Sequence, residues 1–120
     1  MAKNKKNRGS GSKFVPVKIK DHHDKKGGHP HVILGDVRDN HVSVGLTRKP
    51  KKGKNSPNYK LEKNPLGGSD TSYMKRQGTV APKTEYYNPR TGKMTPTDHA
   101  QATKYGEKAR QKHFDKKKKP

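Results

Sequence analysis

The feature that most constrains the fold of this chain is the scarcity of its apolar residues and their arrangement in short runs. Only 23% of the 120 residues are hydrophobic, a fraction that leaves a chain disordered when it is spread evenly. Here the apolar residues are gathered between segments rich in Gly, Pro, Asn, Asp and Lys. Short apolar runs between turn residues are typical of β-strands. We therefore expect one small, mainly β domain with a modest core.

The best-defined element is a predicted β-hairpin over residues 31–47. Its strands are residues 31–37 and 41–47, and the polar segment 38–40 between them favours a tight turn. The second strand alternates cleanly, which places one set of apolar residues on one face. These residues are Val42, Val44 and Leu46.

Three weaker runs complete the predicted sheet. Residues 14–19 contain Pro16, which argues for an edge strand or the start of a strand. Residues 58–62 and 71–80 follow, separated by turn residues. Five short strands predict a small SH3-like barrel or a curled antiparallel sheet over residues 13–82.

The C-terminal part of the chain has a different pattern. Residues 83–94 are predicted to be a loop, and residues 95–115 a single α-helix. Thr95 suits the N-cap, Pro96 the first helical position, and Asp98 follows three residues after the cap. Within this segment, apolar residues recur at helical spacing. They are Ala102, Tyr105 and Ala109.

The charge of the chain indicates its class of partner. Lys and Arg total 30 against 10 acidic residues, a net charge of +20, so association with a polyanion, above all a nucleic acid, is favoured. Residues 1–12 and 116–120 are predicted to be disordered basic tails. No apolar run is long enough to span a membrane, and no hydrophobic segment typical of a secretory signal follows the basic N-terminus. The absence of cysteine fits a reducing compartment, so we expect a cytoplasmic protein.

Several residues are candidates for contact with nucleic acid. A basic loop after the third predicted strand can lie along a phosphate backbone, and tyrosines among cations can stack on unpaired bases. The candidates are Arg48, Lys49, Lys51, Lys52, Lys54, Tyr86, Tyr87, Arg90 and Lys93. Tyr59 and Tyr73 fall on apolar faces and are expected in the core instead.

The seven histidines leave three uses open: metal binding, acid–base chemistry on RNA, and added positive charge. Four lie within residues 22–31, but no structural-zinc spacing matches, so we predict no metal site. The segment 90–95 does not meet the phosphate-loop pattern, because Tyr87 and Met94 occupy positions that require Gly and Ser or Thr. The sequence predicts no cofactor.

Residues 28–47 resemble toxins of the MazF and PemK type. The segment Gly28-His29-Pro30-His31-Val32-Ile33-Leu34 corresponds to an Arg-Pro dipeptide and the strand after it, and the second strand ends at Thr47. The resemblance implies a small SH3-like barrel, often dimeric, that cleaves single-stranded RNA without metal. It implies catalytic roles for His29 and Thr47, with His29 standing where the family has Arg. A histidine lacks the guanidinium fork that holds a phosphate in two places.

We therefore expect an RNA-binding protein whose partner is single-stranded or ribosomal RNA. A toxin of the resembling type would be a metal-independent endoribonuclease, with a homodimer and a small acidic antitoxin as further expected partners. The alternative is a ribosome-associated or nucleoid-type protein without catalytic activity. Basic tails of this kind favour that alternative.

Overall fold

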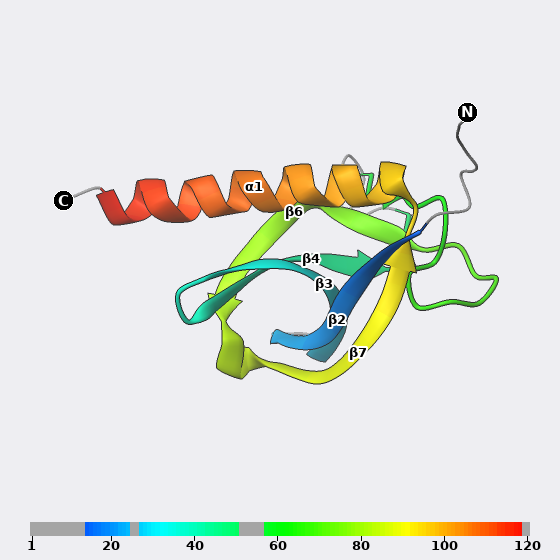
Figure 1. Cartoon of the computed structure of the whole chain (residues 1–120), viewed down its shortest axis with the longest axis horizontal. Helices are drawn as coiled ribbons and strands as arrows, with labels where there is room; N and C mark the ends of the chain where they lie inside the picture. The colour runs from blue at the N-terminus through cyan, green and yellow to red at the C-terminus, as the bar shows by residue number, and fades with distance from the viewer. Residues whose placement is uncertain (1–13, 25–26, 51–56, 119–120) are drawn as a thin grey trace, which may run out of the picture.

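A computed structural model describes residues 14–24, 27–50 and 57–118 of the chain. Within them, six antiparallel strands form one sheet and a single helix follows, so the predicted mainly β class is confirmed (Figure 1). The strands are β2 (Val15–Asp24), β3 (Gly27–Val37), β4 (Asn40–Thr47), β5 (Tyr59–Lys60), β6 (Tyr73–Pro82) and β7 (Tyr86–Met94). A 3-10 turn, η2 (Lys83–Glu85), joins β6 to β7, and α1 spans Pro96–Lys118. The strand order is β5-β6-β4-β3-β2-β7, and the sheet is curled rather than closed into a barrel.

The predicted hairpin is present as β3 and β4. Val37 pairs with Asn40, and the turn between them holds Arg38 at a positive φ of 53°, a left-handed conformation common in tight turns. β2 is longer than the predicted run 14–19 and lies between β3 and β7. Pro16 therefore marks the start of a strand, and the edge position that it also allowed is wrong.

The predicted loop 83–94 is wrong over most of its length, because residues 86–94 form β7. This strand pairs with β2 from Val15↔Met94 to His22↔Tyr86. A register shift opposite Ile19 and Asp21 accommodates the Asn-Pro sequence, and Asn88 has a φ of 55° there. The turn-forming residues of β7 are thus accommodated in a β-bulge, while pairing with β2 stabilises the rest of the strand.

The apolar core lies between the sheet and the first half of α1. Val44 and Leu46 of β4 are buried in it, as the alternation predicts, together with residues from four other strands and the helix. The buried cluster consists of Val17, Ile19, Val32, Val44, Leu46, Leu61, Met74, Met94, Ala102 and Tyr105. Tyr59 packs against this cluster as expected, whereas Tyr73, half-buried like Tyr59, is not part of it.

Two glycines allow α1 to approach the sheet closely. A Cβ on Gly78 of β6 would lie 2.8 Å from the carbonyl oxygen of Tyr105 and 2.9 Å from the Cβ of Ala109. A Cβ on Gly106 of α1 would lie 2.6 Å from Cδ1 of Leu34. The absence of side chains at these two positions sets the distance between helix and sheet.

The start of α1 matches the sequence prediction. The hydroxyl oxygen of Thr95 accepts a hydrogen bond from the backbone N–H of Asp98 at 3.1 Å, the geometry of an N-cap. The helix continues to Lys118, three residues beyond the predicted end at 115, so the predicted tail 116–120 is helical over 116–118. Figure 1 shows its C-terminal end projecting past the sheet.

Candidate functional site

The face of β4 opposite the apolar core is polar and also buried. His41 and Ser43 alternate with Val42 and Val44, so they lie on the other side of the strand. His41 is 6% exposed and Ser43 is fully buried. Burying polar groups costs free energy unless they are hydrogen-bonded, and this side of the sheet satisfies them with an extended network.

The network centres on Tyr86, the first residue of β7. Its hydroxyl lies 2.8 Å from Oγ of Ser43, which lies 3.0 Å from Nδ1 of His31. The ring of His22 packs on Tyr86 with centroids 4.6 Å apart, and its Nε2 donates to Glu85 at 3.0 Å. Burial raises the pKa of Tyr86. We call His22, His31, His41, Ser43 and Tyr86 the histidine cluster.

His41 is joined to two charged residues. Its Nδ1 lies 2.7 Å from Oδ1 of Asp36, and its Nε2 lies 3.0 Å from Nζ of Lys20. A lysine ammonium only donates, so Nε2 of His41 accepts and the ring proton on Nδ1 is donated to Asp36. Hydrogen bonds from His41 and Lys83 hold the pKa of Asp36 below its usual value, which keeps this carboxylate ionised. In this arrangement the lone pair on Nε2 of His41 is directed at Lys20.

This arrangement opens into a cavity of about 560 Å³, which we call the β2 cavity. Its volume is within the range of small-molecule sites, about 300–1,000 Å³. Lys18, Lys20 and Arg90 give the walls positive charge, and Ile33 provides an apolar surface. The full lining is Lys18, Ile19, Lys20, Ile33, Leu34, Gly35, Asp36, His41, Pro89, Arg90 and Thr91.

Arg90 is fixed in place at this cavity. Its Nη2 donates to Oδ1 of Asp21 at 2.8 Å, and its Nη1 donates to the carbonyl of Asn88 at 2.8 Å. Burial raises the pKa of Asp21, but hydrogen bonds from Arg90 and Asn88 outweigh it and leave that pKa below its usual value. This pair holds the guanidinium with further N–H groups left to donate to a ligand.

The predicted basic loop is only partly described. Arg48 and Lys49 are exposed at the end of β4, and Arg48 lies 3.8 Å from Asp70 in a solvent-exposed pair. Lys51, Lys52 and Lys54 lie outside the described residues. Of the candidates in β7, Lys93 is exposed and Arg90 lines the β2 cavity.

The two tyrosines predicted as stacking platforms differ in exposure. Tyr86 is 7% exposed and hydrogen-bonded, so its ring is not accessible to a base and that assignment is wrong. Tyr87 is 44% exposed, and its stacking role stays a prediction. The difference arises because consecutive residues of a strand point to opposite faces of the sheet. The prediction of a loop over these residues gave no reason to expect it.

The two residues assigned by family resemblance lie outside the histidine cluster. His29 is half-buried in β3 and faces His22 across the pair of strands. The hydroxyl oxygen of Thr47 accepts from the backbone N–H of Lys49 at 3.1 Å, which stabilises the end of β4. The structure instead brings together His22, His31 and His41, of which the sequence analysis singled out none as catalytic. The sequence feature that could have indicated this cluster is the set of polar residues that alternate with apolar residues in β3 and β4.

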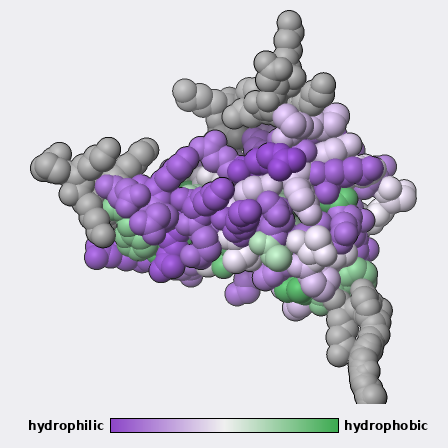
Figure 2. All heavy atoms as spheres, turned by 90° about the horizontal axis from the view of Figure 1, so that it is seen from above, coloured by the Kyte–Doolittle hydropathy of each residue, from purple (hydrophilic) through white to green (hydrophobic). Residues whose placement is uncertain are grey.

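The outer surface of α1 is hydrophilic. Figure 2, which looks onto the helix side of the molecule, shows hydrophilic residues over most of this face. Exposed cations in the helix include Lys104, Lys108, Arg110 and Lys112. In the described ranges these four side chains have no ion-pair partner, so their charge is available to an external anion.

Two features of the described residues bear on other classes of function. No group of three or more His, Cys, Asp or Glu side chains among them is arranged to hold a metal ion. None of the described helices combines the length and the apolar character needed to cross a bilayer.

Comparison with protein-family models, curated proteins and solved structures found no match. The resemblance to MazF and PemK toxins therefore stays a prediction.

Proposed function

We propose that this chain binds RNA and cleaves it in the β2 cavity, with His41 as general base and Lys20 as general acid. The observation that carries the proposal is the hydrogen-bonded series Asp36–His41–Lys20 at the wall of a positively charged cavity. A neutral imidazole oriented by a carboxylate is a common arrangement for proton abstraction. Lys18 and Arg90 supply charge to hold a phosphodiester.

The proposed step is an internal transfer that uses the 2′-hydroxyl of the RNA. Nε2 of His41 removes the 2′-OH proton as the 2′ oxygen attacks phosphorus, and Nζ of Lys20 protonates the departing 5′ oxygen. The 2′-O–P bond forms and the P–O5′ bond breaks, which gives a 2′,3′-cyclic phosphate and a 5′-hydroxyl. The proton then returns from His41 to Lys20, which lie 3.0 Å apart, so both groups regain their starting states.

The choice of RNA over DNA rests on this chemistry and on the resemblance of residues 28–47. To test this, the full chain is incubated with a single-stranded RNA and, separately, with the matched DNA. EDTA is present in both reactions so that any cleavage is independent of metal. We expect cleavage of the RNA only, and a slowing of about 100-fold or more in His41→Gln and Lys20→Gln. Binding is measured separately with the 2′-O-methyl form of the same RNA, which lacks the attacking hydroxyl.

Two further variants make this result specific. His23→Gln removes an exposed histidine of β2 and should leave cleavage unchanged. His29→Ala tests the assignment made from family resemblance. If His29→Ala abolishes cleavage while His41→Gln does not, the catalytic roles proposed here are wrong and the resemblance is the better guide.

A second candidate function is favoured by the helix that projects beyond the sheet in Figure 1. A basic helix of this kind suits a protein embedded in ribosomal RNA, where it would contact phosphates without catalysis. Co-sedimentation with ribosomes, together with intact RNA after prolonged incubation, supports this alternative. A toxin-like role would instead predict a small acidic antitoxin that inhibits cleavage.

A further inference from the structure

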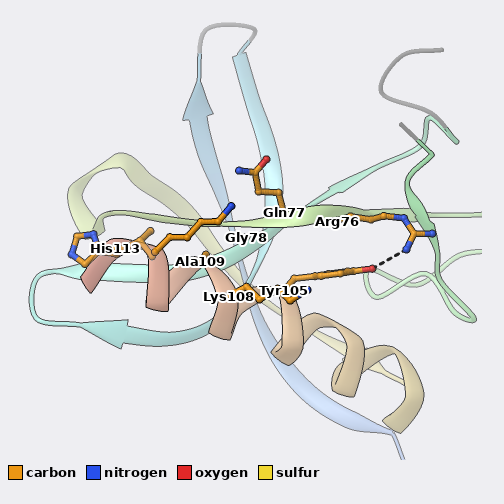
Figure 3. Close-up of a pocket in the computed structure, with 9 residues that line it drawn as sticks. Arg76, Gln77, Gly78, Tyr105, Lys108, Ala109 and His113 are labelled. Carbon is orange, nitrogen blue, oxygen red and sulfur yellow. Dashed lines mark hydrogen bonds between the residues drawn. The ribbon is translucent and has the colours of Figure 1, made fainter. Parts of the chain in front are cut away.

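A basic groove between β6 and α1 lies apart from the β2 cavity and shares no lining residue with it. It has a volume of about 240 Å³. Figure 3 shows Arg76 at one end and His113 at the other, with Gly78 between them. The lining residues are Arg76, Gln77, Gly78, Val80, Tyr105, Lys108, Ala109, Lys112 and His113. None of them is acidic.

The buried nitrogen of His113 is the first sign that the groove is built for a ligand. Its Nε2 is inaccessible to solvent and has no hydrogen-bond partner among the described residues. Buried polar atoms are nearly always hydrogen-bonded, so such an atom calls for a missing partner. The neighbouring Lys108 and Lys112 are donors only, so the partner that fits all three residues is an anion with acceptor oxygens.

Arg76 is the second sign, because two hydrogen bonds orient its guanidinium and leave other N–H groups able to donate. Its Nε donates to the carbonyl of Pro57 at 2.9 Å, and its Nη1 donates to the hydroxyl of Tyr105 at 3.2 Å. The guanidinium has five N–H groups, so others are left to donate. A positioned guanidinium is the side chain best matched to phosphate.

The size of the groove decides between two classes of anion. An α-helix with its side chains is about 10–12 Å across, too wide for a space of about 240 Å³. A single phosphodiester with its sugar is far smaller than such a helix. The groove therefore suits one linkage of a nucleic-acid backbone better than a helix of an acidic protein.

We propose that the groove between β6 and α1 binds a backbone phosphate of RNA, held by Lys108, Lys112 and His113, with Arg76 at the other end placed to contact the adjoining part of the same strand, and so anchors the strand outside the β2 cavity. This site rests on the proposed function and extends it. Gly78 is essential to the geometry, since a Cβ there would meet the helix backbone. The site contributes affinity and leaves the chemical step to His41 and Lys20.

The test compares two double variants of the full chain with equal loss of charge. Lys108→Gln/Lys112→Gln alters the groove, and Arg38→Gln/Lys60→Gln removes two exposed cations outside it, one in the β3–β4 turn and one in β5. The probe is the 2′-O-methyl single-stranded RNA across a salt series. Each lost phosphate contact lowers the steepness of log K against log salt by about 0.7, so the groove variant, which loses one phosphate, should lose about 0.7 and the control almost nothing.

Each outcome separates the two proposals. Equal slopes for both double variants would mean that the charge acts without a defined site, which overturns the groove and leaves RNA binding intact. If the wild-type chain binds no RNA, the proposed function is wrong and the groove with it. The phosphate assignment is supported by two results together. Polyglutamate releases none of the bound RNA, and inorganic phosphate shifts the NMR signals of the His113 ring but not those of the exposed His23. Shifts at His113 with polyglutamate alone would assign the groove to an acidic protein.

Discussion

A single buried carboxylate ties the start of α1 to the segment that follows β5. Asp98 is fully buried, and its Oδ2 accepts from the backbone N–H groups of Glu62 at 2.8 Å and Lys63 at 3.3 Å. The sequence indicated Asp98 as part of a helix start. That its side chain turns away from the helix to hold a distant loop depends on tertiary contacts that no local pattern contains.

We expect Asp98→Ala to lower the free energy of unfolding by about 2–3 kcal/mol. The substitution leaves two N–H groups of the 62–63 segment without an acceptor in a protected site. Asp98→Asn keeps one acceptor oxygen and should lose less. Urea unfolding of the three proteins measures the order, and a wild-type midpoint for Asp98→Ala would contradict it.

The same residue makes stability depend on pH. Burial raises the pKa of Asp98 above the ordinary value of 3.8, so the folded chain binds its proton more tightly than the unfolded chain. The contribution of Asp98 to stability is therefore present at low pH and is lost as pH rises from about 3.8 through the folded pKa. The pKa values of Asp21 and Asp36 are lowered in the folded chain. Their contributions to stability are therefore present above about pH 3.8 and are lost as pH falls below it.

Urea midpoints of the wild type and Asp98→Asn, measured at a series of pH values from about 4 to 7, isolate this term. The difference in stability, wild type minus variant, should fall as pH rises. A difference that stays constant across the range would show that Asp98 does not titrate in it.

Among the elements, those with strong local signals were predictable and those formed by pairing alone were not. The β3–β4 hairpin and the start of α1 carry their own turn and cap residues, and both match the sequence prediction. β7 does not, because Asn88 and Pro89 are turn residues that the strand absorbs in a bulge opposite β2. Because β7 was not predicted, neither the burial of Tyr86 nor its place at the centre of the histidine cluster could be predicted.

The candidate sites show the same limit. Arg90 and Lys93 were predicted from charge alone, and Arg90 does line the β2 cavity. The Asp36–His41 pair lies within one hairpin, but Lys20 reaches it from another strand. The groove joins Arg76 to Lys108 and Lys112 through helix–strand packing, which charge spacing along the chain does not encode.

The packing of α1 on β6 gives a prediction at this scale. Gly78→Ala should lower the free energy of unfolding by about 1–3 kcal/mol, since its Cβ would meet the backbone of Tyr105, which has no means of moving aside alone. Gly35→Ala is the matched control, because a Cβ there meets nothing within 4 Å. Thermal unfolding compares them, and equal stability would show that α1 shifts without cost.

For the whole molecule, the net charge of +20 acts against compactness. The 10 acidic residues are too few to pair with the 30 Lys and Arg residues, even where a pair such as Arg90–Asp21 forms. Much of the positive charge is therefore left to repel itself across the surface, and an anion that binds the folded chain relieves that repulsion.

We expect the Tm to rise as ionic strength increases from about 10 mM to about 100 mM, because the screening length falls from about 30 Å to about 10 Å. RNA added at low salt should raise the Tm further by preferential binding to the folded state. Calorimetry at both ionic strengths checks the first effect. A Tm that falls with salt would show that surface ion pairs outweigh the repulsion.

The pairing of β2 with β7 has a consequence for the order in which the protein becomes complete. β2 is the first described strand in the chain and β7 is the last, so a ribosome releases the first long before its partner. Until then one edge of β2 exposes unpaired backbone groups, the kind of edge that promotes aggregation. The β2 cavity also lacks the wall formed by residues 89–91. A growing chain is thus vulnerable to aggregation, and its β2 cavity is incomplete, until β7 has been made, and long-range closure of this kind makes folding slow.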